Sequence, residues 1–197
     1  MIDESPHPPR LVLIFGPAAV GKMTVGQELA KATGFSLLYN HQIVDLVTGM
    51  FPFGTPMFHR LARGFTLQML EAAAETGLGL ILTHGLVFGR PSSRVIIDDW
   101  SAPCLNAGGE VYYVELTAPL ECRLQRNETE NRRRHKKTDW ATPERLREME
   151  TWGRWDSDGD FPYPERHIVI DNANVEPHEA AQMIRQHFRL PVVAQLR

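Results

Sequence analysis

A loop with a glycine at each end stands between an apolar run and a helical pattern near the start of the chain. The loop follows the apolar residues 11–15 and consists of Gly16, Pro17, Ala18, Ala19, Val20, Gly21, Lys22, Met23 and Thr24. A strand, a glycine-bounded loop with a lysine and then a helix form a phosphate site, because backbone N–H groups and the helix N-terminus attract anions. We therefore predict that these nine residues bind a nucleotide, with Lys22 reaching its β- and γ-phosphates. The alternative is an ordinary strand-to-helix turn with a solvated lysine.

The residue after Lys22 departs from the common form of this loop. Ser or Thr usually follows the lysine, and its hydroxyl meets Mg²⁺. Here Met23 has no hydroxyl, and Thr24 comes next. We expect Thr24 to supply the hydroxyl on the phosphate and metal side, with Mg²⁺ held mainly by waters and phosphate oxygens, since this ion readily keeps several waters. A degenerate loop that binds nucleotide poorly is the alternative.

Composition narrows the class of protein. With 197 residues and a hydrophobic content of 43%, the chain can bury the core of one domain, which we place at 10–190 after a disordered tail at 1–9. A net charge of −3 gives no general case for nucleic-acid or membrane binding. The start has no signal-peptide pattern, and no apolar run reaches the roughly 20 residues of a membrane helix. We expect a cytoplasmic protein whose two cysteines, Cys104 and Cys122, are buried thiols.

Strand-like runs alternate with helical patterns along the chain. The expected strands cover 11–15, 35–39, 79–83, 111–116 and 167–170, and the expected helices cover 22–33, 42–48, 58–75, 92–105, 120–126, 142–152 and 177–188. Such alternation predicts parallel βαβ units in an α/β fold. Ligands of such sheets bind beyond the carboxyl ends of the strands, so the residues just after each strand are the functional candidates.

The motifs and their order resemble the P-loop small-molecule kinases, a group with nucleoside monophosphate kinases, shikimate kinase and chloramphenicol phosphotransferase. The resemblance rests on the loop at 16–24, the strand at 114–116 leading into a helix with Arg123 and Arg126, an arginine-rich segment, and the late strand at 168–172. It implies a three-layer P-loop NTPase fold with a five-stranded parallel sheet in the order 2-3-1-4-5. It also implies a Walker A loop, ATP and Mg²⁺ as cofactors, and a lid at about 126–140. Adenylate kinase likewise has a threonine two positions after the lysine.

Basic residues crowd the segment after the fourth strand. Phosphoryl transfer needs charge stabilisation more than covalent chemistry, and arginines on a closing lid can supply it. The resemblance implies this role for Arg126 and Arg132 and nucleotide contact for Arg123, ahead of Arg133 and Arg134. A solvated basic helix is the alternative. An RNA-binding patch is disfavoured, because no aromatic residues interleave with these arginines.

Histidines and an asparagine follow the second and third strands. Asn40 and His41 come after the second strand, and Asp45 shares a helical face with His41, so that an oriented His41 could accept a proton from a substrate hydroxyl. His84 ends the third strand, where adenylate kinase has an aspartate. If strands two, three and one are neighbours in the sheet, we expect Asn40, His41 and His84 to reach the substrate beside Lys22. The alternatives are a helix cap for Asn40 and a structural role for either histidine.

Three further residues complete the candidate site. Arg90 could bind an anionic acceptor, although a surface arginine is the simpler interpretation. In the resembling kinases the loop after the fifth strand lies near the adenine base, which implies nucleotide contacts for Asn172 and Asn174. An ordinary turn is the alternative there.

The segment before the last strand carries two structural predictions. Met149, Trp152 and Trp155 fall at helical spacing and are expected to cover the core. Residues 156–160 are rich in aspartate, but the glycine stands at the wrong position for an EF-hand and the closing glutamate is missing. We predict a polar surface turn there.

Together these features predict an ATP-dependent phosphotransferase that acts on a small molecule, with Lys22, Arg126, Arg132 and His41 as catalytic residues. A hydroxyl-bearing metabolite or antibiotic is favoured, because residues 83–87 replace the Asp-Gly-Phe-Pro-Arg type segment of the monophosphate kinases. One alternative is a nucleotide-binding regulatory protein with little transferase activity, which the absent hydroxyl and carboxylate at positions 23 and 84 favour. A nucleoside monophosphate kinase is the other.

Overall fold

Five parallel strands form one sheet in the computed structural model, which describes residues 8–127 and 142–193. The strands are β1 (Arg10–Phe15), β2 (Ser36–Tyr39), β3 (Gly79–His84), β4 (Glu110–Thr117) and β5 (His167–Asp171). Their order across the sheet is β2-β3-β1-β4-β5, and every neighbouring pair is parallel. The predicted α/β fold and strand order are confirmed.

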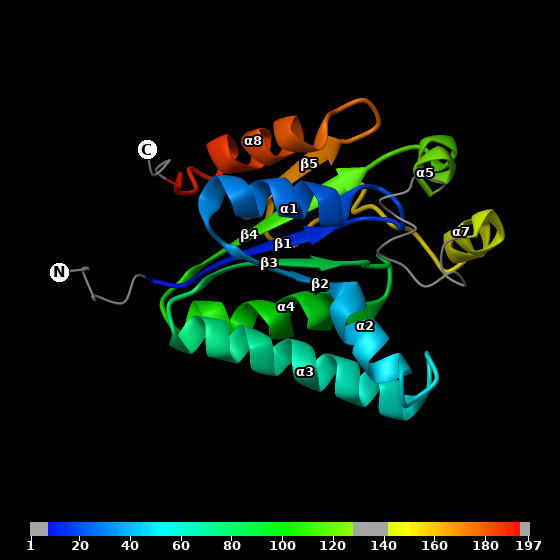
Figure 1. The fold of residues 1–197 in the computed structure, drawn as a ribbon, viewed down its shortest axis with the longest axis horizontal. Helices are drawn as coiled ribbons and strands as arrows, with labels where there is room; N and C mark the ends of the chain where they lie inside the picture. The colour runs from blue at the N-terminus through cyan, green and yellow to red at the C-terminus, as the bar shows by residue number, and fades with distance from the viewer. Residues whose placement is uncertain (1–7, 128–141, 194–197) are drawn as a thin grey trace.

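Helices cover both faces of the sheet and make three layers (Figure 1). α1 (Lys22–Thr33) and α8 (Pro177–His187) lie on one face, and α3 (Pro56–Glu75) and α4 (Pro91–Asn106) lie on the other. Three shorter helices lie towards the carboxyl ends of the strands, namely α2 (Asn40–Thr48), α5 (Leu120–Asn127) and α7 (Pro143–Glu150). This end of the sheet is where the loops of a candidate site gather.

The residues of β1 alternate between two hydrophobic cores. Leu11, Leu13 and Phe15 pack on the side of α3 and α4, whereas Val12 and Ile14 pack on the side of α1 and α8. The strand is buried on both faces because it is central in a parallel sheet covered by helices. Its fixed position therefore determines where the loop that follows it begins.

Helix starts follow signals that the sequence carries. Proline occupies the first turn of α3, α4 and α8, where its missing N–H leaves no donor unpaired. Thr55 caps α3, because its hydroxyl accepts a hydrogen bond from the Phe58 N–H at 3.2 Å. The cap interpretation of Asn40 is wrong, since Asn40 is the first helical residue of α2. It follows Tyr39, whose N–H donates to the Gln42 side chain at 3.0 Å.

The helix expected over 142–152 is shorter than predicted. α7 ends at Glu150, and Gly153 has a φ angle of 143°, which is incompatible with a continuing helix. Trp155 is buried and Trp152 half-buried, so both pack against the fold without belonging to a helix. The predicted polar surface turn at 156–160 is present, with its aspartates exposed, but Ser157 within it is buried.

Parts of the sequence predictions lie outside the described residues. Arg132 and nearly all of the expected lid do, as do residues 1–7 of the expected tail. Pro9 from that tail is buried, and its carbonyl oxygen accepts a hydrogen bond from the Glu110 N–H at 3.0 Å. The chain is therefore tied to the fold from Pro9 onwards.

Two expectations from composition can be compared with the structure. Cys104 is buried, as predicted, but Cys122 is only half-buried because it lies on the outer helix α5. None of the helices in the described part of the chain combines the length and the apolar character that crossing a membrane requires.

Candidate active site

Residues 16–24, the phosphate loop, begin directly after β1 and lead into α1. Gly16 and Gly21 have positive φ angles of 138° and 108°. A Cβ atom at Gly16 would lie 2.2 Å from the Leu116 carbonyl oxygen, and one at Gly21 would lie 2.7 Å from Nδ2 of Asn172. Both positions therefore require glycine, for the backbone angle and for the space. The result is a narrow backbone cradle of the kind that fits phosphate groups.

Lys22 folds back over the phosphate loop. Its Nζ donates hydrogen bonds to the carbonyl oxygens of Gly16 at 2.7 Å and Pro17 at 2.6 Å. The ammonium group thus lies against the loop that is predicted to bind the phosphates. Met23 and Thr24 are half-buried in the first turn of α1, so the Thr24 hydroxyl belongs to the helix N-terminus.

Arg126 and Asn172 contact the C-terminal half of the phosphate loop. Arg126 donates to the Val20 carbonyl at 3.1 Å and to the carbonyls of Asn172 at 2.5 Å and Ala173 at 3.1 Å. The Asn172 side-chain amide donates to the same Val20 carbonyl at 2.6 Å. The structure thus brings both predicted residues to the loop, whereas Asn174 is exposed beyond them.

Arg123 is buried against the N-terminal half of the phosphate loop. Its guanidinium donates to the Ala18 carbonyl at 3.4 Å and the Ala118 carbonyl at 3.1 Å. It also forms a two-point ion pair with Glu150 of α7, at 3.0 and 2.6 Å. Glu150 was not among the predicted site residues, because nothing in the local pattern of α7 distinguishes it from the other acidic residues there. The pair links the helix before the expected lid to the helix after it.

His84 lies at the carboxyl end of β3, beside the start of the phosphate loop, because β3 pairs with β1. Its ring packs edge-on against Trp100, with ring centroids 4.6 Å apart. Burial and then the positive charge of Lys22 lower the pKa of His84 from 6.5 to about 3. His84 is therefore a neutral imidazole at physiological pH, with one donor and one acceptor.

The sheet order also places the end of β2 on this edge. Asn40 and His41 begin α2 there and are both half-buried. Asp45 lies one turn further along the same helix, and its orienting contact with His41 stays a prediction. His41 and His84 share the edge of the sheet with Lys22, as the strand order requires.

Residues 152–157, the strap, run beside the loop that follows β3. The Phe88 N–H donates to the Arg154 carbonyl at 2.6 Å. The Arg90 guanidinium donates to the Trp152 carbonyl. Arg90 thus attaches the strap to the start of α4. The sequence had suggested either a surface arginine or a residue that binds an anionic acceptor, and not this contact.

A buried carboxylate holds the end of the strap. Glu115 of β4 is 1% exposed, and its Oε1 accepts from the Ser157 N–H at 2.9 Å while its Oε2 lies 3.2 Å from Nε2 of His167. Burial by itself raises the pKa of Glu115, but the close contact with His167 and the hydrogen bond from Ser157 outweigh it and hold that pKa below 4.5. The glutamate is therefore an ionised anchor at neutral pH.

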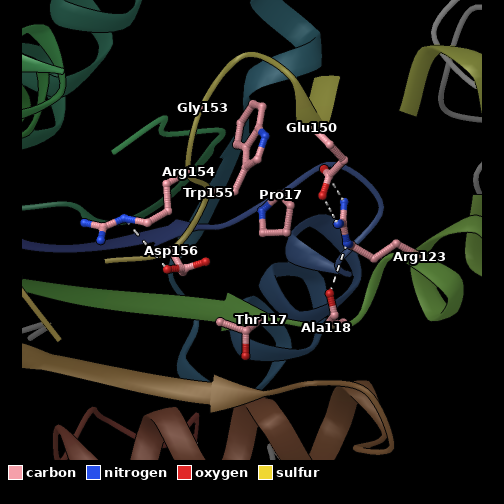
Figure 2. Close-up of a pocket in the computed structure, with 9 residues that line it drawn as sticks. All are labelled: Pro17, Thr117, Ala118, Arg123, Glu150, Gly153, Arg154, Trp155 and Asp156. Carbon is pink, nitrogen blue, oxygen red and sulfur yellow. Dashed lines mark hydrogen bonds and ion pairs between the residues drawn. The ribbon is translucent and has the colours of Figure 1, made fainter. Parts of the chain in front are cut away.

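A hollow of about 210 Å³ lies between the strap and the phosphate loop (Figure 2). Its walls are Pro17 of the phosphate loop, Thr117 and Ala118 at the end of β4, Arg123 of α5, Glu150 of α7, and residues 153–156 of the strap. Figure 2 shows Pro17 in the middle, with the Arg123–Glu150 pair on one side and Arg154 and Asp156 on the other. The hollow is thus a concave feature that adjoins the phosphate loop.

The donor set suits a magnesium ion that is bound mainly through a nucleotide. Within 8–127 and 142–193, no three His, Cys, Asp or Glu side chains gather closely enough to hold a metal ion. Thr24 offers one hydroxyl at the N-terminus of α1. Mg²⁺ commonly keeps several waters and binds substrate phosphates with few protein ligands, so these residues fit that mode.

Comparisons with known proteins identify the fold. No protein-family model and no curated protein sequence matches the chain. A sugar kinase from Janibacter sp. matches with a TM-score of 0.62 and 17% identity, over 93% of this chain and 96% of that one. A tunicamycin resistance protein from Deinococcus radiodurans matches with a TM-score of 0.58 and 18% identity, over 94% and 99%. A shikimate kinase from Acinetobacter baumannii, crystallised with shikimate, matches with a TM-score of 0.57 and 21% identity, over 94% of each chain. The chain has the fold of the P-loop small-molecule kinases.

Within this P-loop kinase fold, the strap and its anchor are the parts of the site that the sequence did not predict. In the sequence, Glu115 is only one residue of a predicted buried strand, and the spacing of Trp152 and Trp155 predicts a helix. Gly153 was the available signal, because a glycine directly after Trp152 interrupts the helical spacing.

Proposed function

We propose that the chain is an ATP-dependent phosphotransferase that moves the γ-phosphate to a hydroxyl group of a small molecule. The observation that carries the proposal is the phosphate loop itself, with two obligatory glycines and with Lys22 held at 2.6–2.7 Å from its first carbonyls. Solved structures of the same fold that are named as sugar kinase and shikimate kinase support a small-molecule acceptor.

Lys22 and the loop amides bind the phosphate groups. The acceptor hydroxyl oxygen forms a bond to the γ-phosphorus, and the bond from that phosphorus to the β–γ bridging oxygen breaks. ADP leaves with the electron pair, and the hydroxyl proton passes to His41 or to solvent. Arg126 and Arg132 offset the charge on the transferred group, because a loose transition state spreads that charge over the equatorial oxygens.

Mg²⁺, when bound with ATP, neutralises the β- and γ-oxygens. Thr24 is the residue of this chain that would hold it through a hydroxyl group, and Arg123, Asn172 and Asn174 are assigned to the nucleotide. Asn40 and His84 are assigned to the acceptor, His84 as a neutral hydrogen-bonding group.

A regulatory protein that binds nucleotide with little transfer is the second candidate. It is favoured by Met23, which removes the usual metal-facing hydroxyl, and by His84, which places a neutral ring where a carboxylate would organise Mg²⁺. A nucleoside monophosphate kinase is less well supported, because residues 83–87 lack its arginine.

The experiment combines calorimetric ATP binding with ADP release in the presence of Mg²⁺. The acceptor panel contains hydroxylated metabolites, antibiotics and nucleoside monophosphates. Lys22→Ala is compared with Lys31→Ala, because Lys31 is an exposed lysine of the same helix that pairs with Glu28.

Acceptor-dependent ADP release that Lys22→Ala abolishes and Lys31→Ala preserves supports the phosphotransferase. Tight ATP binding without turnover for any acceptor supports the regulatory protein instead. A folded protein that binds neither ATP nor GTP rules out both.

A further inference from the structure

The hollow adjoins the place where a γ-phosphate would lie. Pro17 forms part of its wall, and the carbonyl of the same residue accepts a hydrogen bond from Lys22 Nζ at 2.6 Å. A molecule in the hollow therefore lies next to the group that is predicted to hold the transferred phosphate. Proximity of this kind is the first requirement of an acceptor subsite.

The wall formed by the strap is firmly positioned. The Trp155 indole N–H donates to the Met149 carbonyl at 3.0 Å, and its ring lies 3.1 Å from the position of a Cβ atom at Gly85. Behind it, Glu115 accepts a hydrogen bond from the buried Ser157. The strap is thus fixed from both sides, although it has no regular secondary structure. Fixed loops on rigid elements are typical of binding walls.

The charges that line the hollow are balanced. Arg123 faces Glu150 in a two-point pair, and Arg154 lies 3.9 Å from Asp156, so the two arginines and two carboxylates sum to zero. An anionic ligand would meet two carboxylates, and a cationic one would meet two guanidinium groups. An uncharged hydroxyl both donates and accepts hydrogen bonds, so it satisfies either kind of group.

The size of the hollow limits the ligand. Its 210 Å³ lies below the roughly 300–1,000 Å³ of pockets for drug-sized ligands. Pro17, Ala118 and Trp155 give it apolar surface beside the charged groups. A small carbon skeleton with several hydroxyl groups matches both properties, and a nucleoside monophosphate matches neither.

We infer that the hollow is the acceptor subsite and that its ligand is a small, uncharged polyol or monosaccharide. The inference rests on the proposed phosphotransferase function and assigns residues of the strap, α7 and the end of β4 to the acceptor in addition to Asn40 and His84. Asp156 supplies a hydrogen-bond acceptor to the ligand hydroxyls from the wall formed by the strap.

The test uses the full chain with uncharged polyols and monosaccharides, and with sugar acids and nucleoside monophosphates as charged counterparts. Binding is measured by calorimetry with a non-hydrolysable ATP analogue present, and turnover by ADP release. Asp156→Asn is compared with Asp158→Asn. Asp158 is the matched control because it pairs with the same Arg154 at 3.2 Å but is 76% exposed and outside the hollow.

We expect Asp156→Asn to raise the KM for the polyol about tenfold, because a hydrogen bond to a charged acceptor is replaced by a weaker one to a neutral amide, with the ATP Kd unchanged. Asp158→Asn leaves both values unchanged. Three results overturn the inference: a preference for charged acceptors, no polyol binding to the ATP-analogue complex, or equal KM values for Asp156→Asn and Asp158→Asn. A failure of the proposed function is distinguishable, because it appears as absent ATP binding in the wild-type chain.

Discussion

The side-chain amide of Asn172 donates a hydrogen bond to the carbonyl oxygen of Val20 at 2.6 Å, across 152 residues of sequence. The bond joins the loop after the last strand to the middle of the phosphate loop. The Arg126 guanidinium contacts the same carbonyl from α5 at 3.1 Å. The phosphate loop is therefore held at Val20 by two side chains, one from α5 and one from the loop after β5, and its shape depends on them.

Removal of the Asn172 amide should loosen the phosphate loop. We expect Asn172→Ala to lower the free energy of unfolding by about 1–3 kcal/mol, because a buried polar contact is lost, and to weaken ATP binding. Asn174→Ala is the control, since Asn174 is exposed two residues further on. Chemical denaturation and calorimetry measure the two effects. An Asn172→Ala protein with wild-type ATP affinity would show that the loop keeps its shape without this bond.

The first glycine of the phosphate loop should tolerate no side chain. Gly16→Ala combines an unfavourable φ of 138° with a clash on the Leu116 carbonyl at 2.2 Å. Gly54 also has a positive φ, 82°, but its side-chain position is in open space. We expect Gly54→Ala to cost roughly 1 kcal/mol of strain and Gly16→Ala clearly more than about 2 kcal/mol. Denaturant unfolding of the two variants checks the difference, and equal losses would contradict the close approach to Leu116.

The strands and the place of the phosphate loop could be predicted from the sequence because both depend on local signals, whereas the order of the strands was implied only by the resemblance to the P-loop kinases. Apolar runs, glycines and the first-turn prolines act within a few residues of themselves. The strap could not be predicted in this way. Its position depends on the hydrogen bond of Ser157 to Glu115, which belongs to β4, and on the backbone hydrogen bond between Phe88 and Arg154. Both contacts join residues that are far apart in the sequence. Helical spacing of Trp152 and Trp155 was a misleading signal, because both are placed by these tertiary contacts.

The pH dependence of stability should contain a term from His84. Its folded-state pKa of about 3 lies below the ordinary 6.5, so between these values the unfolded chain binds a proton that the folded chain does not. The stability from neutral His84 is complete above pH 6.5 and declines as the pH falls towards 3. We expect His84→Gln to make the loss of stability over this range shallower. His178→Gln, which removes an exposed histidine of α8, is the control.

Urea unfolding at several pH values measures this slope. Lys22→Met should act in the same direction as His84→Gln but more weakly, because the Lys22 charge is the second cause of the lowered pKa. An unchanged slope in His84→Gln would mean that the ring is protonated at the same pH in both states.

The two thiols should differ in reactivity. Burial raises the pKa of Cys104 to about 11, and its Sγ lies 3.4 Å from the Pro9 and Glu110 carbonyls. Cys122 is half-buried on α5. We expect Ellman's reagent to modify one thiol rapidly at pH 8 and the other only after denaturation. Cys122→Ser should remove the fast phase and Cys104→Ser the slow one, and two fast phases in the native protein would contradict the burial of Cys104.

The Glu115 carboxylate should stabilise the fold at neutral pH and lose this effect in acid. Its pKa lies below 4.5 in the folded chain, so the folded state binds the proton less readily than the unfolded state. We expect Glu115→Gln to lower the free energy of unfolding by about 2–4 kcal/mol at pH 7, because the buried contact with His167 loses its charge. The difference from wild type should narrow as the pH falls below 4.5. Glu75→Gln, at an exposed position of α3, is the control. A difference that stays constant down to pH 3 would show that the ionised form of Glu115 does not anchor the strap.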